Sequence, residues 1–155
     1  METTIPKKTK APHQIEKVEK IIYNPRIIIK ETTHIDVLRI SDEEEFTRID
    51  FIYTAPKRYT NGGWVQMHPD CFIRPCGSST QLKLVKAVNI PIAPSKYFFK
   101  KINEVLCYTL YFPALPSGTT SIDIIESESF GENWFNFYGV SLEQIKSDRI
   151  QVNNN

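Results

Sequence analysis

The densest group of side chains that could bind a metal lies in one short stretch. His68, Asp70, Cys71 and Cys76 offer imidazole, carboxylate and thiol groups, which are the usual ligands of zinc. A zinc site needs about four convergent ligands, and they normally come in paired short spacings. Here the spacing is irregular, and apolar residues and a proline interrupt it. The pattern therefore favours a loop that enters a strand, and we expect no metal site and no cofactor.

Two groups of carboxylates could bind calcium, because hard cations prefer clustered oxygen ligands. The first is the run from Asp42 to Glu45, and the second comprises Glu126, Glu128 and Glu132. Neither group is accompanied by the alternating acidic loop of a calcium-binding hand. Both are interpreted as solvated acidic turns.

The sequence contains no arrangement that predicts a catalytic nucleophile. It has no Gly-x-Ser-x-Gly elbow and no glycine-rich phosphate loop. The histidines are isolated, and a thiol pair of Cys76 with His68 is weaker than the interpretation of Cys76 as a structural loop residue. Paired carboxylates for glycoside chemistry stay open at this point, since nothing in the sequence positions them. We expect no catalytic residue and a protein that is not an enzyme.

Composition limits the partners. The chain has 155 residues and a net charge of +1, which fits one domain and lacks the basic excess typical of nucleic-acid binders. No apolar run reaches the roughly 18 residues needed to span a bilayer, so we expect no membrane span. The N-terminal stretch METTIPKKTKAPHQIEK has no apolar core of a signal peptide. We expect a cytoplasmic protein or, alternatively, an exported mature form whose leader has been removed.

The elements that would position any site are strands. In the C-terminal third, apolar and polar residues alternate from Leu106 to Phe112, and similar runs follow at 121–126 and 134–142. Proline, glycine, serine and asparagine bound these runs, which is typical of half-buried strands. Cys107 lies within the first run, and we expect it to be a small buried residue.

Earlier runs extend the same pattern. Residues 34–40 and 46–54 predict an antiparallel hairpin, residues 96–101 predict a strand or a helical turn, and residues 14–23 fit either a helix or a strand. Further strand-like runs occupy residues 26–31, 64–67, 71–74 and 80–90. Together these runs predict an all-β fold, a single antiparallel β-sandwich of about seven or eight strands. The expected organisation is an N-terminal arm at 1–23, the sandwich at 24–146 and a tail at 147–155.

Several motifs resemble a known type of domain. The segments GGWVQMHPDCFIRP, FPALPSGTTSIDIIE and NWFNFYGVSL are similar to an uncharacterised immunoglobulin-like β-sandwich domain that is common in Bacteroidota. The resemblance covers about residues 24–142, and that domain is often found in exported proteins. It implies the fold, and it implies no catalytic residue.

Aromatic residues suggest how such a domain works. They occur on both faces of the last strand-like run, and exposed aromatic patches mark partner sites. The N-terminal segment 14–23 could also cover them. The predicted partner surface comprises Tyr97, Phe98, Phe99, Trp134, Phe135, Phe137 and Tyr138.

This surface predicts a non-catalytic module with a protein partner, used for protein–protein interaction or assembly. The first alternative is a module that binds carbohydrate or a cell surface, which requires exposed tryptophan or tyrosine platforms. A hydrolase accessory domain is the weaker alternative. The exposure of Trp64 and Trp134 distinguishes these hypotheses, because two buried tryptophans would argue against a sugar platform.

Overall fold

The protein is all-β. The computed structural model describes residues 19–129 and 134–144, and these contain twelve strands in three sheets and one short 3-10 turn at Thr60–Gly62. The all-β class predicted from the alternation is confirmed, but the predicted number of strands is too low. The run predicted at 80–90 is divided into two strands that belong to different sheets, and the segment predicted as an N-terminal arm contributes a strand at 20–23.

The first sheet has the order β1-β3-β4-β10-β8, and every neighbouring pair is antiparallel. Its strands are β1 (Lys20–Tyr23), β3 (Ile35–Asp42), β4 (Phe46–Thr54), β10 (Val105–Pro113) and β8 (Lys86–Val88). The predicted hairpin is confirmed, because β3 and β4 pair directly. The central pair, β4 and β10, is nine residues long on each side.

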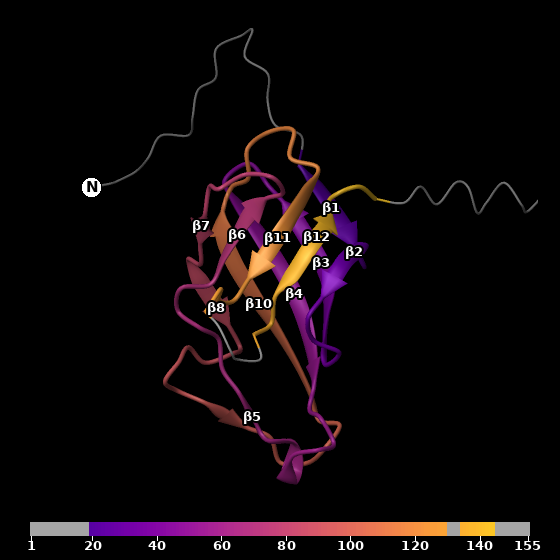
Figure 1. The fold of residues 1–155 in the computed structure, drawn as a ribbon, viewed down its shortest axis with the longest axis vertical. Coiled ribbons are helices and arrows are strands. Elements are labelled where there is room, and N and C mark those ends of the chain that lie inside the picture. Colours follow the sequence, from indigo (N-terminus) through magenta and orange to yellow (C-terminus); the bar gives the residue numbers. More distant parts are fainter. Residues whose placement is uncertain (1–18, 130–133, 145–155) are drawn as a thin grey trace, which may run out of the picture.

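The second sheet has the order β2-β12-β11-β6-β7, again antiparallel throughout. Its strands are β2 (Ile27–Lys30), β12 (Phe137–Ser141), β11 (Ser121–Ile125), β6 (Phe72–Pro75) and β7 (Leu82–Lys83). A small third sheet pairs β5 (Trp64–Val65) with β9 (Tyr97–Phe98). In Figure 1, β5 lies at the lower end of the view, below the two large sheets.

The two large sheets pack against each other through one apolar core. Phe51 of β4 stacks on Tyr108 of β10 with ring centroids 4.9 Å apart, and it also meets Phe137 of β12 in the opposite sheet at 6.0 Å. Each phenylalanine buried in this way contributes about 1.5–3 kcal/mol to stability. The core therefore joins residues that are far apart in the sequence.

The alternation in β10 is confirmed. Leu106, Tyr108, Leu110 and Phe112 are buried, whereas the residues between them face outward. The prediction that Cys107 is buried is wrong, because its position in the alternation places it on the exposed face. All three cysteines have free thiols, so Cys71 and Cys76 do not form a disulfide.

Both lateral edges of the molecule are crossed by chain that changes sheet. At one edge, β1 belongs to the first sheet and β2 to the second, and at the other edge β7 and β8 divide in the same way (Figure 1). Asn24, with a φ of 47°, and Pro25 make the first change of sheet, because left-handed asparagine and proline both end a strand.

The predicted domain boundary at residue 24 therefore separates β1 from the sheet to which it belongs. Lys20–Tyr23 pairs with β3, so the segment that fitted either a helix or a strand is a strand in its second half. The rest of the predicted arm, up to residue 18, and the predicted tail at 147–155 lie outside the described residues. Within the described part of the chain, no helix has the length and apolar character required to cross a bilayer.

Candidate functional site

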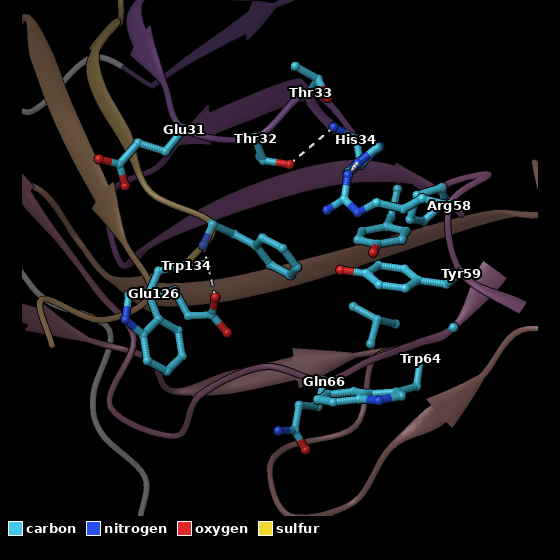
Figure 2. A pocket seen from close by; sticks show the side chains of 15 residues that line it. Glu31, Thr32, Thr33, His34, Arg58, Tyr59, Trp64, Gln66, Glu126 and Trp134 are labelled. Atoms are coloured by element: carbon cyan, nitrogen blue, oxygen red, sulfur yellow. Dashed lines mark hydrogen bonds between the residues drawn. The ribbon is translucent and has the colours of Figure 1, made fainter. Parts of the chain in front are cut away.

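One end of the molecule carries a pocket of about 640 Å³. It lies where β4 ends, β3 begins and β5 crosses below them, and Figure 2 shows it from close by. Its volume is within the range of small-molecule binding sites, about 300–1,000 Å³. The side chains and backbone around it come from Glu31, Thr32, Thr33, His34, Tyr53, Pro56, Arg58, Tyr59, Gly63, Trp64, Val65, Gln66, Glu126, Trp134 and Phe135.

Both tryptophans of the chain line this pocket. Trp64 is 46% exposed, and Lys96 Nζ lies 4.4 Å from its ring centroid. Trp134 is half-buried, and its indole Nε1 donates a hydrogen bond of 3.0 Å to the backbone oxygen of Ser129. Its ring and that of His68 are nearly perpendicular, with centroids 5.6 Å apart. Each indole is thus held in place by a specific contact.

A tight turn brings Tyr59 and Trp64 to the same site. Gly62 and Gly63 have φ values of 90° and 77°, which favour glycine. A Cβ atom at Gly62 would lie 2.7 Å from the Cβ of Ala55, so a larger residue does not fit there. Figure 2 shows Tyr59 above Trp64 with its hydroxyl directed into the space between the aromatic rings and Glu126.

Glu126 is the buried carboxyl group of the pocket. It follows β11, is only 5% exposed, and accepts a hydrogen bond at each carboxyl oxygen. The backbone N–H of Phe135 donates to Oε1 at 2.9 Å, and that of His68 donates to Oε2 at 3.1 Å. Burial raises the pKa of Glu126 to about 7, although both hydrogen bonds act in the opposite direction. Among the described residues, no basic side chain forms an ion pair with it.

Asn136 fixes the backbone that carries this carboxyl group. Its buried side-chain oxygen accepts a hydrogen bond of 2.7 Å from the N–H of Glu126, and its Nδ2 donates to the oxygen of Ser127 at 2.9 Å. Asn136 lies just before β12, so it connects the segments on both sides of residues 130–133. It is a positioning residue for Glu126.

The wall opposite Glu126 is basic. Arg58 lies 4.8 Å from the ring centroid of Tyr59, and its NH1 is 3.4 Å from Nε2 of His34. Burial and the charge of Arg58 together lower the pKa of His34. In Figure 2, Arg58 and His34 lie on one side of the pocket and Glu126 on the other. The pocket is therefore polarised between an acidic wall and a basic wall.

The carboxyl groups that line the pocket are the buried Glu126 and the exposed Glu31. A buried carboxyl group with a pKa near neutrality can act as a general acid, but glycoside hydrolysis uses a pair of carboxyl groups. The other carboxylate at the pocket, Glu31, is solvent-exposed. Burial and the charge of Glu126 raise the pKa of the Cys71 thiol well above the usual range, which disfavours the reactive thiolate.

The predicted partner surface is divided among four places. Phe99 and Phe137 are 5% and 1% exposed and belong to the core, so neither can contact a partner. Tyr97 and Phe98 form β9, where Phe98 pairs with Trp64. The remaining three are separated in the same way, with Trp134 and Phe135 lining the pocket and Tyr138 half-buried on β12. The seven residues therefore do not form one surface.

The group His68, Asp70, Cys71 and Cys76 does not converge. Cys71 is buried while Cys76 is exposed and lies near Asp123, and Nδ1 of His68 accepts a hydrogen bond from the backbone of Asp70. Within residues 19–129 and 134–144, no three histidine, cysteine or acidic side chains are grouped so as to hold a metal ion. The acidic residue Glu132 lies outside these ranges.

Sequence reasoning missed the importance of Glu126, Tyr59 and Arg58. Glu126 was grouped with exposed acids, although it directly follows two buried isoleucines at the end of β11. A charged residue that continues a buried run is a signal for a buried, functional carboxyl group. Tyr59 and Arg58 lie in the loop that precedes Trp64, and no local pattern marks them.

Comparison of the chain with known proteins identifies no family. No protein-family model matches the chain, and no curated protein or solved structure matches it. The function is therefore inferred from the pocket itself.

Proposed function

We propose that this protein is a non-catalytic binding module of the immunoglobulin-like sandwich type, and that it binds carbohydrate in the aromatic pocket. The observation that carries this proposal is the position of Trp64 and Trp134, which line one pocket together with the buried carboxyl group of Glu126. This was the first alternative in the sequence analysis, and the exposure of the two tryptophans favours it over the partner surface predicted there.

The chemical groups of the pocket complement those of a sugar ring. A pyranose has an apolar C–H face, which packs on aromatic rings, and a rim of hydroxyl groups, which need hydrogen-bond partners. Trp64, Trp134 and Tyr59 supply rings, and Glu126 and Arg58 supply an acceptor and a donor on opposite walls. Pockets of this kind, mostly apolar with a few fixed polar groups, bind small polar ligands with defined orientation.

Tryptophan fluorescence tests this proposal directly. Because the chain has only two tryptophans and both line the pocket, intrinsic fluorescence reports on that site alone. Titration with soluble oligosaccharides should give a saturable change in intensity or emission maximum. Incubation for hours should release no shorter product, since the module is non-catalytic.

A matched pair of variants locates the effect. Trp64→Ala should abolish oligosaccharide binding measured by calorimetry, whereas Phe98→Ala should leave it unchanged. Phe98 is 64% exposed and pairs directly with Trp64, but it does not line the pocket. If no oligosaccharide changes the fluorescence, or if Trp64→Ala binds as well as the native protein, the carbohydrate proposal is wrong.

A second candidate function, self-association, is favoured by the edge strand β2. Ile28 and Ile29 are 81% and 53% exposed there, and exposed edge strands pair readily with other strands. In an antiparallel pair with a second copy centred between these isoleucines, Arg26 of each chain would face Glu31 of the other. The charges are therefore complementary in a two-fold symmetric contact.

Sedimentation velocity over a wide concentration range tests self-association. The native protein should show a dimer that grows with concentration, and Ile28→Lys should remain monomeric. Val85→Lys is the control, because Val85 is 69% exposed and lies between β7 and β8 at the opposite edge. A native protein that is monomeric at every concentration would exclude this contact.

A further inference from the structure

Glu126 is a buried carboxyl group that has no compensating cation among the residues the structure describes. Only 5% of the residue is exposed, and its hydrogen bonds come from two neutral backbone N–H groups. The ion pairs of the described residues involve other carboxylates, as in Arg74 with Asp123 and Arg39 with Asp50, and none of them involves Glu126. Burying an unpaired charge is costly, so a ligand that brings a positive charge to Glu126 gains more than a neutral one.

The aromatic rings of the pocket also favour a cation. Ammonium groups are attracted to the faces of tryptophan and tyrosine within about 6 Å. This protein shows that preference at the site itself, because Lys96 Nζ lies 4.4 Å from the ring centroid of Trp64 and Arg58 lies 4.8 Å from that of Tyr59. Gln66 adds a buried side-chain oxygen at the pocket that accepts no hydrogen bond from the described residues.

We infer that the saccharide bound in this pocket is an amino sugar whose protonated amine pairs with the carboxylate of Glu126. This inference rests on the proposed function and specifies its ligand class. The amine lies on the acidic side of the pocket, against Glu126 and the indole of Trp134, and away from Arg58. The hydroxyl groups on the other side of the sugar face Arg58 and His34.

Three oligosaccharides of equal length and the same β-1,4 linkage provide the test. They carry an amine, an acetamide or a hydroxyl group at C2: the glucosamine oligomer, its fully N-acetylated counterpart and the glucose oligomer. The hydroxyl group is close in size to the amine and the acetamide is larger, so the two neutral sugars separate the effect of charge from the effect of size. Affinities are measured by tryptophan fluorescence and calorimetry with the native protein.

The amine compound should bind about tenfold more tightly or better, because a charge-assisted contact is stronger than a neutral one. Equal affinity for all three would overturn the amino-sugar inference and leave the carbohydrate proposal standing. Failure of all three to bind would overturn the carbohydrate proposal, and the inference with it. Competition by lysine amide as effective as the amino sugar would show that the amine is recognised without the sugar, which also overturns the inference.

The pH dependence supplies an independent readout. The contact requires an ionised Glu126 carboxylate and a protonated ligand amine. Affinity should therefore fall below the pKa of Glu126, about 7, and again above the pKa of the ligand amine. The neutral sugars should show no such maximum, and one that they shared with the amine compound would overturn the inference. The titratable and charged groups around Glu126 are Glu31, His34, Tyr53, Arg58, His68, Cys71 and Tyr108.

A variant pair completes the design. Glu126→Gln removes the charge, so the variant should bind the amine compound no more tightly than the glucose oligomer. Glu45→Gln, at an exposed position in the turn between β3 and β4, should keep the higher affinity for the amine compound. Thermal unfolding checks that Glu126→Gln is folded. A folded Glu126→Gln that kept the full preference would overturn the assignment of the amine to this residue, and the three-ligand comparison stands if the variant does not fold.

Discussion

Asp50, on the outer face of β4, and Glu126, in the wall of the pocket, are both removed from bulk water but are held in opposite ways. Arg39 donates to one oxygen of Asp50 at 2.8 Å, and Arg48 and Thr109 donate to the other at 3.0 and 2.6 Å. Burial alone would raise the pKa of Asp50, but the hydrogen bonds and the two guanidinium charges outweigh it and lower that pKa. For Glu126, burial prevails.

The difference distinguishes a carboxylate that is neutralised within the fold from one that a bound cation could neutralise. Asp50 is satisfied within the sheet, and its charge connects three strands. Glu126 has its hydrogen bonds from the backbone but no opposite charge among the described residues. The protein neutralises the half-buried carboxylates of Asp50 and Asp123 with arginine. No described residue does the same for Glu126, which lies at the wall of a pocket where a bound ligand can reach it.

The largest expected effect is a loss of stability as the pH rises through the titration of Glu126. Its pKa is raised from 4.5 in the unfolded chain to about 7 in the folded one, so the folded state prefers the protonated form. The stability it contributes is present below pH 4.5 and is lost between pH 4.5 and about 7. The change amounts to about 3 kcal/mol at about 1.4 kcal/mol per pKa unit.

Chemical denaturation of the native protein and of Glu126→Gln at a series of pH values measures this change. The difference between the two unfolding free energies removes the contributions of all other groups. Between pH 4.5 and about 7, the native protein should lose about 3 kcal/mol of unfolding free energy relative to Glu126→Gln. A difference that does not change with pH would show that Glu126 is as well compensated as Asp50.

The second effect runs in the opposite direction. Asp50→Asn removes two ion pairs and leaves Arg39 and Arg48 as neighbouring like charges, so it should cost about 1–2 kcal/mol at neutral pH. Because the pKa of Asp50 is lowered in the folded state, this stability is present above its ordinary pKa of 3.8 and is lost in stronger acid. Denaturation of Asp50→Asn at neutral and acidic pH measures it, and an equal cost at both would contradict the assignment.

The long central strands could be predicted from the sequence because their side chains alternate. The predicted run at 46–54 coincides with β4, and the burial of every second residue in β10 follows the pattern. The run at 134–142 was predicted as one strand, but β12 begins at Phe137. Upstream of it, the N–H of Phe135 donates to the side chain of Glu126 and not to a neighbouring strand.

The pocket could not be predicted because it is assembled from the ends of elements. Trp64, Glu126 and Trp134 are brought together by the packing of the sheets and by the turn at Gly62 and Gly63, and no short-range spacing records that contact. Local aromatic content instead indicated the run at 96–101, where Phe99 turned out to complete the core by stacking on Tyr53 at 5.3 Å.

The smallest expected effect compares Glu126 with Glu128, the same residue type two positions further on. The Glu128 carboxylate is 52% exposed and accepts a hydrogen bond of 3.0 Å from Arg74 on the outer face of the sheet. Exposed ion pairs contribute about 0–1 kcal/mol, so Glu128→Gln should change the unfolding free energy by less than about 1 kcal/mol. It should leave both the pH profile of stability between pH 4.5 and 7 and the binding of oligosaccharides unchanged. If Glu128→Gln removed that pH profile, the profile would belong to the acidic segment as a whole, and the contrast between a compensated and an uncompensated carboxyl group would no longer explain it.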